Sequence, residues 1–215
     1  MKQLARGILR LAGLDVYRAR GGVFLCPRPR AGEAADPKAF PSPLRLNLGC
    51  GNKRLEGHFN IDIVATPATD LACDITRLPM FADGTAEEIR LEAVYEHLFR
   101  HERLAAIREW FRVLKPGGRL RVDWIPDFDA VAGRYVRREP GLLGPEFDLE
   151  EVYRFTHGDP VAWNAPEQIH KDLFTRASVE RELREAGYVI ESIENALFAD
   201  EKFSVNLNVV ARKPE

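Results

Sequence analysis

Residues 44–52 read LRLNLGCGN and decide the fold. A short predicted strand, Leu44–Leu48, passes directly into Gly49-x-Gly51, where glycine lets the backbone turn sharply and lets a ligand lie against it. In open α/β sheets, ligands bind beyond the carboxyl ends of the strands, near the point where the strand order reverses. The stretch therefore predicts a first strand followed by a ligand-binding loop.

This loop differs from two common nucleotide-binding loops. A dinucleotide-binding loop needs a third glycine where Arg54 stands, and a phosphate-binding loop needs Gly-Lys-Ser/Thr, which is absent. Both pyrophosphate interpretations are therefore weakened.

The remaining pattern alternates strands and helices, which predicts an α/β fold with a mainly parallel sheet. About ten residues separate the first two strands, so the helix between them is expected to shrink to a turn or two. The predicted strands after the first cover residues 59–64, 70–73, 89–94, 119–125, 188–193 and 203–211, and the main helices cover 98–114 and 176–186.

Two aspartates follow consecutive predicted strands. Asp62 ends the second strand, where a carboxylate can accept hydrogen bonds from both hydroxyls of a ribose. Asp74 follows the third strand, where it can accept from an exocyclic amine such as that of adenine. Either residue alone also fits a turn or cap. Their joint occurrence favours the ligand-binding interpretation.

Five motifs in order resemble class I S-adenosylmethionine-dependent methyltransferases of the small type 11 kind. They are LNLGCG at 46–51, NID at 60–62, DI and LP at 74–79, YEHL at 95–98 and LKPGG at 114–118. The resemblance spans residues 44–212 and implies a single Rossmann-like domain. It also implies a seven-stranded sheet in the order 3-2-1-4-5-7-6, with strand 7 antiparallel.

The resemblance implies S-adenosyl-L-methionine as cofactor and S-adenosyl-L-homocysteine as product. Two positions depart from the family pattern, because Asn47 replaces the usual acid and Lys53 the usual third glycine. The cofactor-binding residues that the motifs imply are Asn47, Gly49, Cys50, Gly51, Asp62, Ile63, Asp74, Ile75 and Tyr95.

An alcohol acceptor must lose its proton during methyl transfer, so a base is expected near the methyl group. His97 is the first candidate because it follows the fourth strand, His170 is the second and Asp127 the third; a helix-start role for His97 is the alternative. His97 and His101 are four residues apart, but Leu98 stands where a zinc protease has glutamate. No metal is therefore expected.

Residues 126–175 form an insertion that, in the family resembled, builds the acceptor pocket. Helices are predicted over 128–138 and 148–155, and aromatic side chains alternate with polar ones, which favours O-methylation of a saccharide of a surface polysaccharide or glycosylated metabolite. The predicted acceptor contacts are Trp124, Tyr135, His157, Trp163 and Asn164. Three alternatives remain: aromatics that form the insertion's own core, a natural-product or lipid-like acceptor, and a non-catalytic cofactor-binding or partner module.

The N-terminal 43 residues differ from the methyltransferase region, 44–215. Residues 1–30 hold seven basic residues and one acid. The spacing of Leu4, Ile8, Leu11 and Leu14 predicts a basic amphipathic helix, followed by a Pro-rich linker. This helix is expected either to pack on the domain or to contact a membrane surface.

The overall charge bears on the class of partner, and a small-molecule or saccharide acceptor is the expected one. A net charge of −2 argues against nucleic acid. The absence of a spanning run or signal sequence and the three scattered cysteines favour a cytoplasmic protein.

Overall fold

The computed structural model describes residues 14–19, 22–27, 40–158, 168–198 and 202–215. Most of the predicted N-terminal helix lies outside these residues. Its last apolar position, Leu14, instead begins strand β1 (Leu14–Ala19), which pairs antiparallel with β2 (Gly22–Pro27). Both segments are rich in β-branched and aromatic residues, which favour strands over helices.

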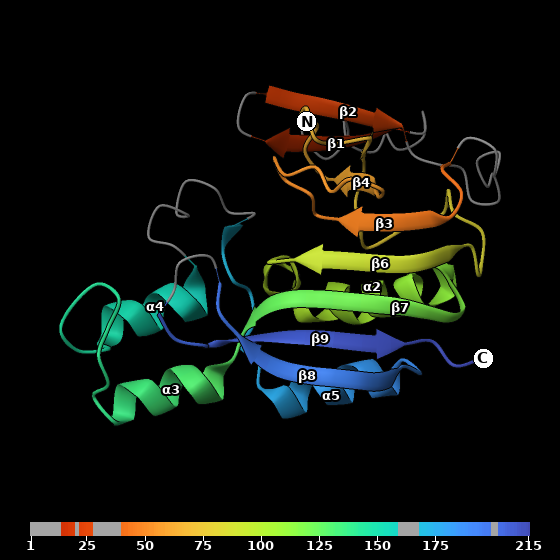
Figure 1. Cartoon of the computed structure of the whole chain (residues 1–215). Helices are drawn as coiled ribbons and strands as arrows, with labels where there is room; N and C mark the ends of the chain where they lie inside the picture. The colour runs from red at the N-terminus through yellow and green to blue at the C-terminus, as the bar shows by residue number, and fades with distance from the viewer. Residues whose placement is uncertain (1–13, 20–21, 28–39, 159–167, 199–201) are drawn as a thin grey trace.

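The main sheet has seven strands in the order β5-β4-β3-β6-β7-β9-β8 (Figure 1). Strands β3 to β7 run parallel, and β9 is antiparallel to both of its neighbours. Renumbered from β3, this order is 3-2-1-4-5-7-6, so the predicted fold is confirmed. The strands are β3 (Leu44–Leu48), β4 (Phe59–Asp62), β5 (Leu71–Ala72), β6 (Ala86–Glu92), β7 (Leu114–Pro126), β8 (Val189–Ala196) and β9 (Asn206–Arg212).

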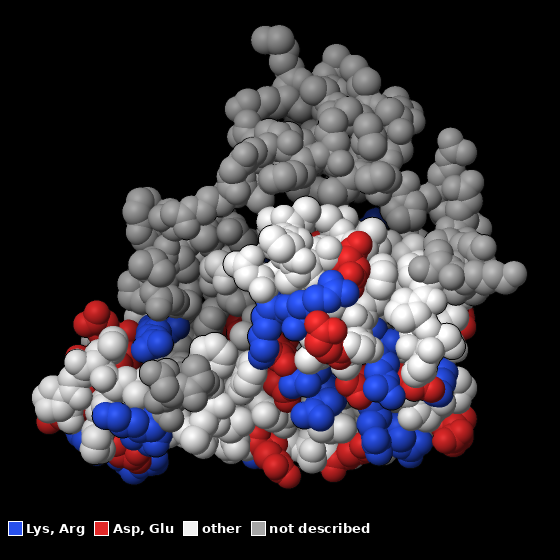
Figure 2. Space-filling view, turned by 45° about the horizontal axis from the view of Figure 1, so that its top comes forward, with Lys and Arg blue, Asp and Glu red and all other residues white. Residues whose placement is uncertain are grey.

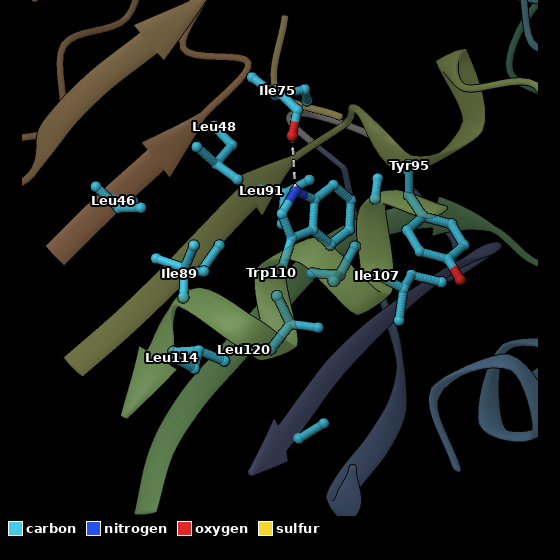
Figure 3. Packing of buried hydrophobic residues seen from close by; sticks show 14 of the residues in the cluster. Leu46, Leu48, Ile75, Ile89, Leu91, Tyr95, Ile107, Trp110, Leu114 and Leu120 are labelled. Carbon is cyan, nitrogen blue, oxygen red and sulfur yellow. Dashed lines mark hydrogen bonds between the residues drawn. The ribbon is translucent and has the colours of Figure 1, made fainter. Parts of the chain in front are cut away.

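Helices α2 (Arg100–Val113) and α5 (Arg176–Glu185) cover one face of this sheet (Figure 1). Trp110 of α2 is fully buried there, and its indole N–H donates a 2.9 Å hydrogen bond to the carbonyl oxygen of Ile75 (Figure 3). Alternate strand residues point to this layer and form the core, among them Leu46, Leu48, Ile89, Leu91, Leu120 and Val122.

The opposite face of the sheet carries charged residues, and no helix connects β3 to β4 there. Residues 49–58, which connect β3 to β4, form turns and contain no helix, so the shortened crossover contracts even further than expected. On this face Arg90 forms ion pairs with Glu92 at 2.7 Å and with Asp123 at 3.2 Å. Parallel sheets normally bury both faces. Here interleaved acidic and basic side chains make the described surface compatible with water (Figure 2).

The insertion contains α3 (Phe128–Val136) and α4 (Leu149–His157), each within two residues of its predicted bounds. A second core cluster forms beneath them from Val131, Phe147, Phe155 and Val205. Phe147 and Phe155 therefore serve the insertion's own core, which was the structural alternative for its aromatic residues. None of the described helices is long and apolar enough to cross a membrane.

Candidate active site

The candidate site lies at the carboxyl edge of the parallel strands. Chain segments that leave β3, β4, β5, β6 and β7 meet at this edge because these strands share one direction. The loop after β3 is tied to the neighbouring strand, since the N–H groups of Gly49 and Cys50 donate to the carbonyl oxygen of Ile61 at 2.8 and 3.1 Å. The edge is therefore built from segments that are dispersed in the sequence.

Gly49 is required at its position for two reasons. Its φ of +77° lies in the left-handed region, and a Cβ added there would stand 2.4 Å from Cγ2 of Val94. Val94 follows β6, so this close approach couples the glycine loop to the segment after the fourth parallel strand.

Asp62 connects the glycine loop to the end of β4. Its Oδ2 accepts from the N–H of Gly51 at 2.7 Å, and its Oδ1 accepts from the N–H of Val64 at 2.9 Å. Each carboxylate oxygen can accept a further hydrogen bond. Asp62 is half-buried, and the neighbouring Ile63 is 42% exposed. A carboxylate beside an exposed apolar side chain suits a ribose joined to an aromatic base.

Asp74 provides a second acceptor after β5. Its Oδ1 accepts from the backbone N–H and the hydroxyl of Thr76, at 2.9 and 2.7 Å. Its Oδ2 has no hydrogen-bond partner among the described residues, so it can accept from an amine. Together with Asp62 and Ile63, this acceptor fits the adenosine half of S-adenosylmethionine.

Four of the residues predicted to bind cofactor are buried, namely Asn47, Cys50, Ile75 and Tyr95. The Asn47 amide is 5% exposed and donates to Oδ1 of Asn60 at 2.9 Å, so it braces two strands beneath the loop. Cys50 and Ile75 are also buried. Burial raises the pKa of the Cys50 thiol, as expected for a small buried residue rather than a nucleophile.

Tyr95, which is predicted to contact the cofactor, has its side chain in the core. Its ring is fully buried in the core against Phe174, and its hydroxyl donates to Glu182 at 2.7 Å. The YEHL motif therefore supplies a core anchor at its first position.

Lys53 and Glu92 form an ion pair at this edge, and neither residue was predicted to bind the cofactor. Nζ of Lys53 lies 2.8 Å from Oε2 of Glu92, and 5.6 Å from the centre of the Trp124 ring. Trp124 itself has a φ of +67°, a conformation that L-residues seldom adopt. Such backbone outliers cluster at functional sites. The replacement of the third glycine by Lys53 was the only sequence signal for this pair.

His97 and His170 come together from two segments, with ring centres 5.1 Å apart. His97 belongs to a short 3₁₀ helix, η2 (Tyr95–His97), and His170 lies where the insertion returns to the sheet. Burial, helped by the nearby His170, lowers the pKa of His97 to about 4, and burial also lowers the pKa of His170. Both imidazoles are therefore neutral at pH 7.

Asp127, the third candidate base, serves as a helix cap. It is 6% exposed, accepts from the N–H of Asp129 at 3.3 Å at the start of α3, and accepts from the Asn195 amide at 3.0 Å. Both oxygens are thus used in holding α3 on the sheet, and the structure adds no support to the prediction that this residue is a base.

The predicted acceptor contacts are dispersed. Tyr135 packs against the second core cluster, and Nδ1 of His157 lies 2.8 Å from the Thr156 hydroxyl. Trp124 stays at the carboxyl edge. Trp163 and Asn164 lie outside the described residues.

Comparisons with known proteins agree with this architecture. Residues 56–122 match the sequence model of the family described as methyltransferase domain. A structure of an S-adenosylmethionine-dependent methyltransferase from Methanosarcina mazei is similar, with 15% identity and a TM-score of 0.52, covering 82% of this chain and 96% of that one.

Two ligand-bound structures are similar at 14% identity. The 1,6-didemethyltoxoflavin-N1-methyltransferase of Burkholderia thailandensis, solved with that substrate and S-adenosylhomocysteine, has a TM-score of 0.53 over 83% of this chain and 73% of that one. A glycopeptide N-methyltransferase solved with S-adenosylmethionine has a TM-score of 0.54 over 83% and 84%. No curated protein matches the sequence. At these identities the structural likeness shows the fold alone. The family match, over residues 56–122, includes motifs identified in the sequence.

Proposed function

We propose that this chain, a class I S-adenosylmethionine-dependent methyltransferase, methylates a hydroxyl group of a saccharide. The observation that carries the proposal is the corner formed by His97 and His170. It places two neutral imidazoles at the carboxyl edge, although the residues are far apart in sequence. The cofactor supplies a methyl group on a sulfonium, which is a good leaving group.

Three sets of described residues are each assigned to a different part of the cofactor. Asp62 takes the ribose hydroxyls, and Oδ2 of Asp74 takes the adenine amine. The Lys53–Glu92 pair offers charges opposite to those of the cofactor's carboxylate and ammonium groups. Glu92 thereby supplies the negative charge that Asn47, in place of the family's usual acid, lacks.

The acceptor is placed on the far side of the methyl group. A bound cofactor would supply the methyl group and keep the carbon–sulfur electron pair on its sulfur, and the histidine corner would receive the proton of the acceptor hydroxyl. A neutral imidazole can receive that proton. Trp124 offers an aromatic face at the same edge, and an aromatic surface beside polar groups suits a sugar ring.

The test is methyl transfer from labelled cofactor to a panel of saccharides, with aliphatic amines and lipid-like alcohols as competing acceptors. Labelled saccharide is expected. His97→Gln is expected to lower kcat by about 10²–10⁴-fold, the range for a lost proton acceptor. The matched control is His101→Gln, because His101 is exposed and outside the corner. Transfer to amines alone, or full activity in His97→Gln, contradicts the proposal.

A further inference from the structure

A third ligating side chain, Glu96, joins the two histidines. One possible metal-ligand atom from each of Glu96, His97 and His170 lies within 4.8 Å of the other two. Two of the three side chains come from η2 and the third from the end of the insertion. Because the cluster combines imidazole nitrogens with a carboxylate, its chemistry differs from that of an exposed acidic patch.

The Glu96 carboxylate is held in an unusual environment. The residue is 3% exposed, and its Oε2 has no hydrogen-bond partner among the described residues. Its Oε1 lies 3.9 Å from Nε2 of His97. Burial raises the pKa of Glu96 to about 8. The group is therefore neutral at pH 7 while no cation is near it, and binding a cation would ionise it, since buried charges are normally paired or coordinate a metal.

The histidine rings are oriented by backbone carbonyl groups. Nδ1 of His170 lies 2.9 Å from the carbonyl oxygen of Phe155, and Nδ1 of His97 lies 3.4 Å from that of Ile169. An Nδ1–H that donates to a carbonyl leaves the lone pair on Nε2, the arrangement that metal-binding histidines usually show.

Lys171 follows His170 in the chain, and its side chain contacts the segment that holds His97. Nζ of Lys171 donates to the carbonyl oxygen of His97 at 2.6 Å and lies 5.0 Å from the centre of the Phe99 ring.

We propose that Glu96, His97 and His170 bind one divalent transition-metal ion. Two imidazoles and a carboxylate suit Zn²⁺, Co²⁺, Ni²⁺ or Fe²⁺, whereas Mg²⁺ and Ca²⁺ prefer sites made of oxygen ligands. Three protein ligands also leave a coordination position for another group, as in catalytic zinc sites.

The role of the ion rests on the proposed function, whereas its binding does not. With the ion in place, the acceptor hydroxyl occupies the remaining position and His97 and His170 act as ligands. In the metal-loaded chain, coordination would make the hydroxyl more acidic and its proton would pass to water. In the metal-free chain, an imidazole would receive that proton, as proposed above. The bound ion would thus act on the acceptor oxygen directly.

The test uses the untagged full-length chain, stripped with a chelator and titrated with Co²⁺ by calorimetry and visible absorption. One equivalent is expected to bind, with absorption bands of nitrogen-coordinated Co²⁺, and Zn²⁺ is expected to displace it. Glu96→Gln and His170→Gln are expected to weaken binding by about 100-fold or more, since even the outer partners of metal ligands contribute 10–100-fold. His101→Gln should bind as tightly as the parent chain.

Absence of one-equivalent binding by the parent chain overturns the inference, as does equal affinity in the parent chain and both variants. Circular dichroism of each variant verifies its fold, and the parent titration remains decisive if a variant unfolds. Metal binding without saccharide methylation would refute the proposed function while supporting the site. Chelator-resistant methylation without metal binding would do the reverse.

Discussion

Replacing Arg103 by methionine is expected to destabilise the protein by about 3–5 kcal/mol, the usual effect of removing one partner of a buried ion pair. Arg103 is fully buried in α2. Its Nε and Nη2 donate to the two carboxylate oxygens of Glu182 at 3.0 and 2.9 Å, and Nη2 also donates to Asp172 at 2.8 Å. The guanidinium also lies 4.5 Å from the centre of the Phe174 ring.

The magnitude follows from what the substitution leaves behind. Glu182 is 6% exposed and would keep only its hydrogen bond from the Tyr95 hydroxyl. A buried carboxylate without its cation accounts for most of the expected loss, because methionine can fill much of the space of the arginine stem. Asp172 is only partly buried, so its loss of a partner contributes less.

The assay is urea unfolding at pH 7, followed by tryptophan fluorescence and circular dichroism. The double variant Arg103→Met with Glu182→Leu removes both charges, and a buried ion pair can often be replaced by apolar residues with little loss. The double variant is therefore expected to be more stable than Arg103→Met alone. A loss below about 1 kcal/mol in the single variant, or additive losses in the double, would refute the reasoning.

Three further predictions address the loop, the pH dependence and the core. Gly49→Ala should destabilise by about 2 kcal/mol or more in thermal unfolding, because the positive φ alone disfavours alanine by ~1–2 kcal/mol and its Cβ meets Val94; an unchanged melting temperature would contradict this. Burial acts to raise the pKa of Asp70, but hydrogen bonds led by the Asn60 N–H outweigh it and lower the pKa. This stabilisation is present above the unfolded pKa of ~4 and is lost as pH falls, so acid titration of Asp70→Asn should show a shallower loss of stability, and an identical acid profile would count against it. Trp110→Phe should lose about 1–3 kcal/mol in urea unfolding, since a buried carbonyl loses its donor, and no change would show that this hydrogen bond is dispensable.

The local pattern of the sequence was sufficient to predict the sheet. Apolar runs bounded by glycine and proline located the seven strands, and the resemblance supplied their order, which the structure confirms. The helices of the insertion were predicted because their periodicity is local. The β1–β2 hairpin was missed because the helical spacing that ends at Leu14 was the only pattern interpreted before the Pro-rich linker.

A residue of the candidate site could be predicted only where its position depends on the end of a single strand. Asp62 ends β4 and Asp74 lies two residues after β5. The pairing of Lys53 with Glu92 depends instead on neighbouring strands and cannot be derived from spacing. The contact of Glu96 with His170 likewise requires the insertion to return to the sheet. Asp127 had a readable signal, since an aspartate directly before a helix is a preferred N-cap, and it was interpreted as a base instead.

The most direct test of the central claim is calorimetric binding of S-adenosylmethionine and S-adenosylhomocysteine to the full-length chain and to Asp62→Ala. One site of micromolar affinity is expected, weakened by about tenfold or more in the variant, because charge-assisted hydrogen bonds contribute ~1.5–3 kcal/mol. Glu56→Gln, an exposed change in the same connection, should leave the affinity unchanged. Absence of binding at millimolar cofactor, or equal affinity in Asp62→Ala, would contradict the cofactor site described for this fold.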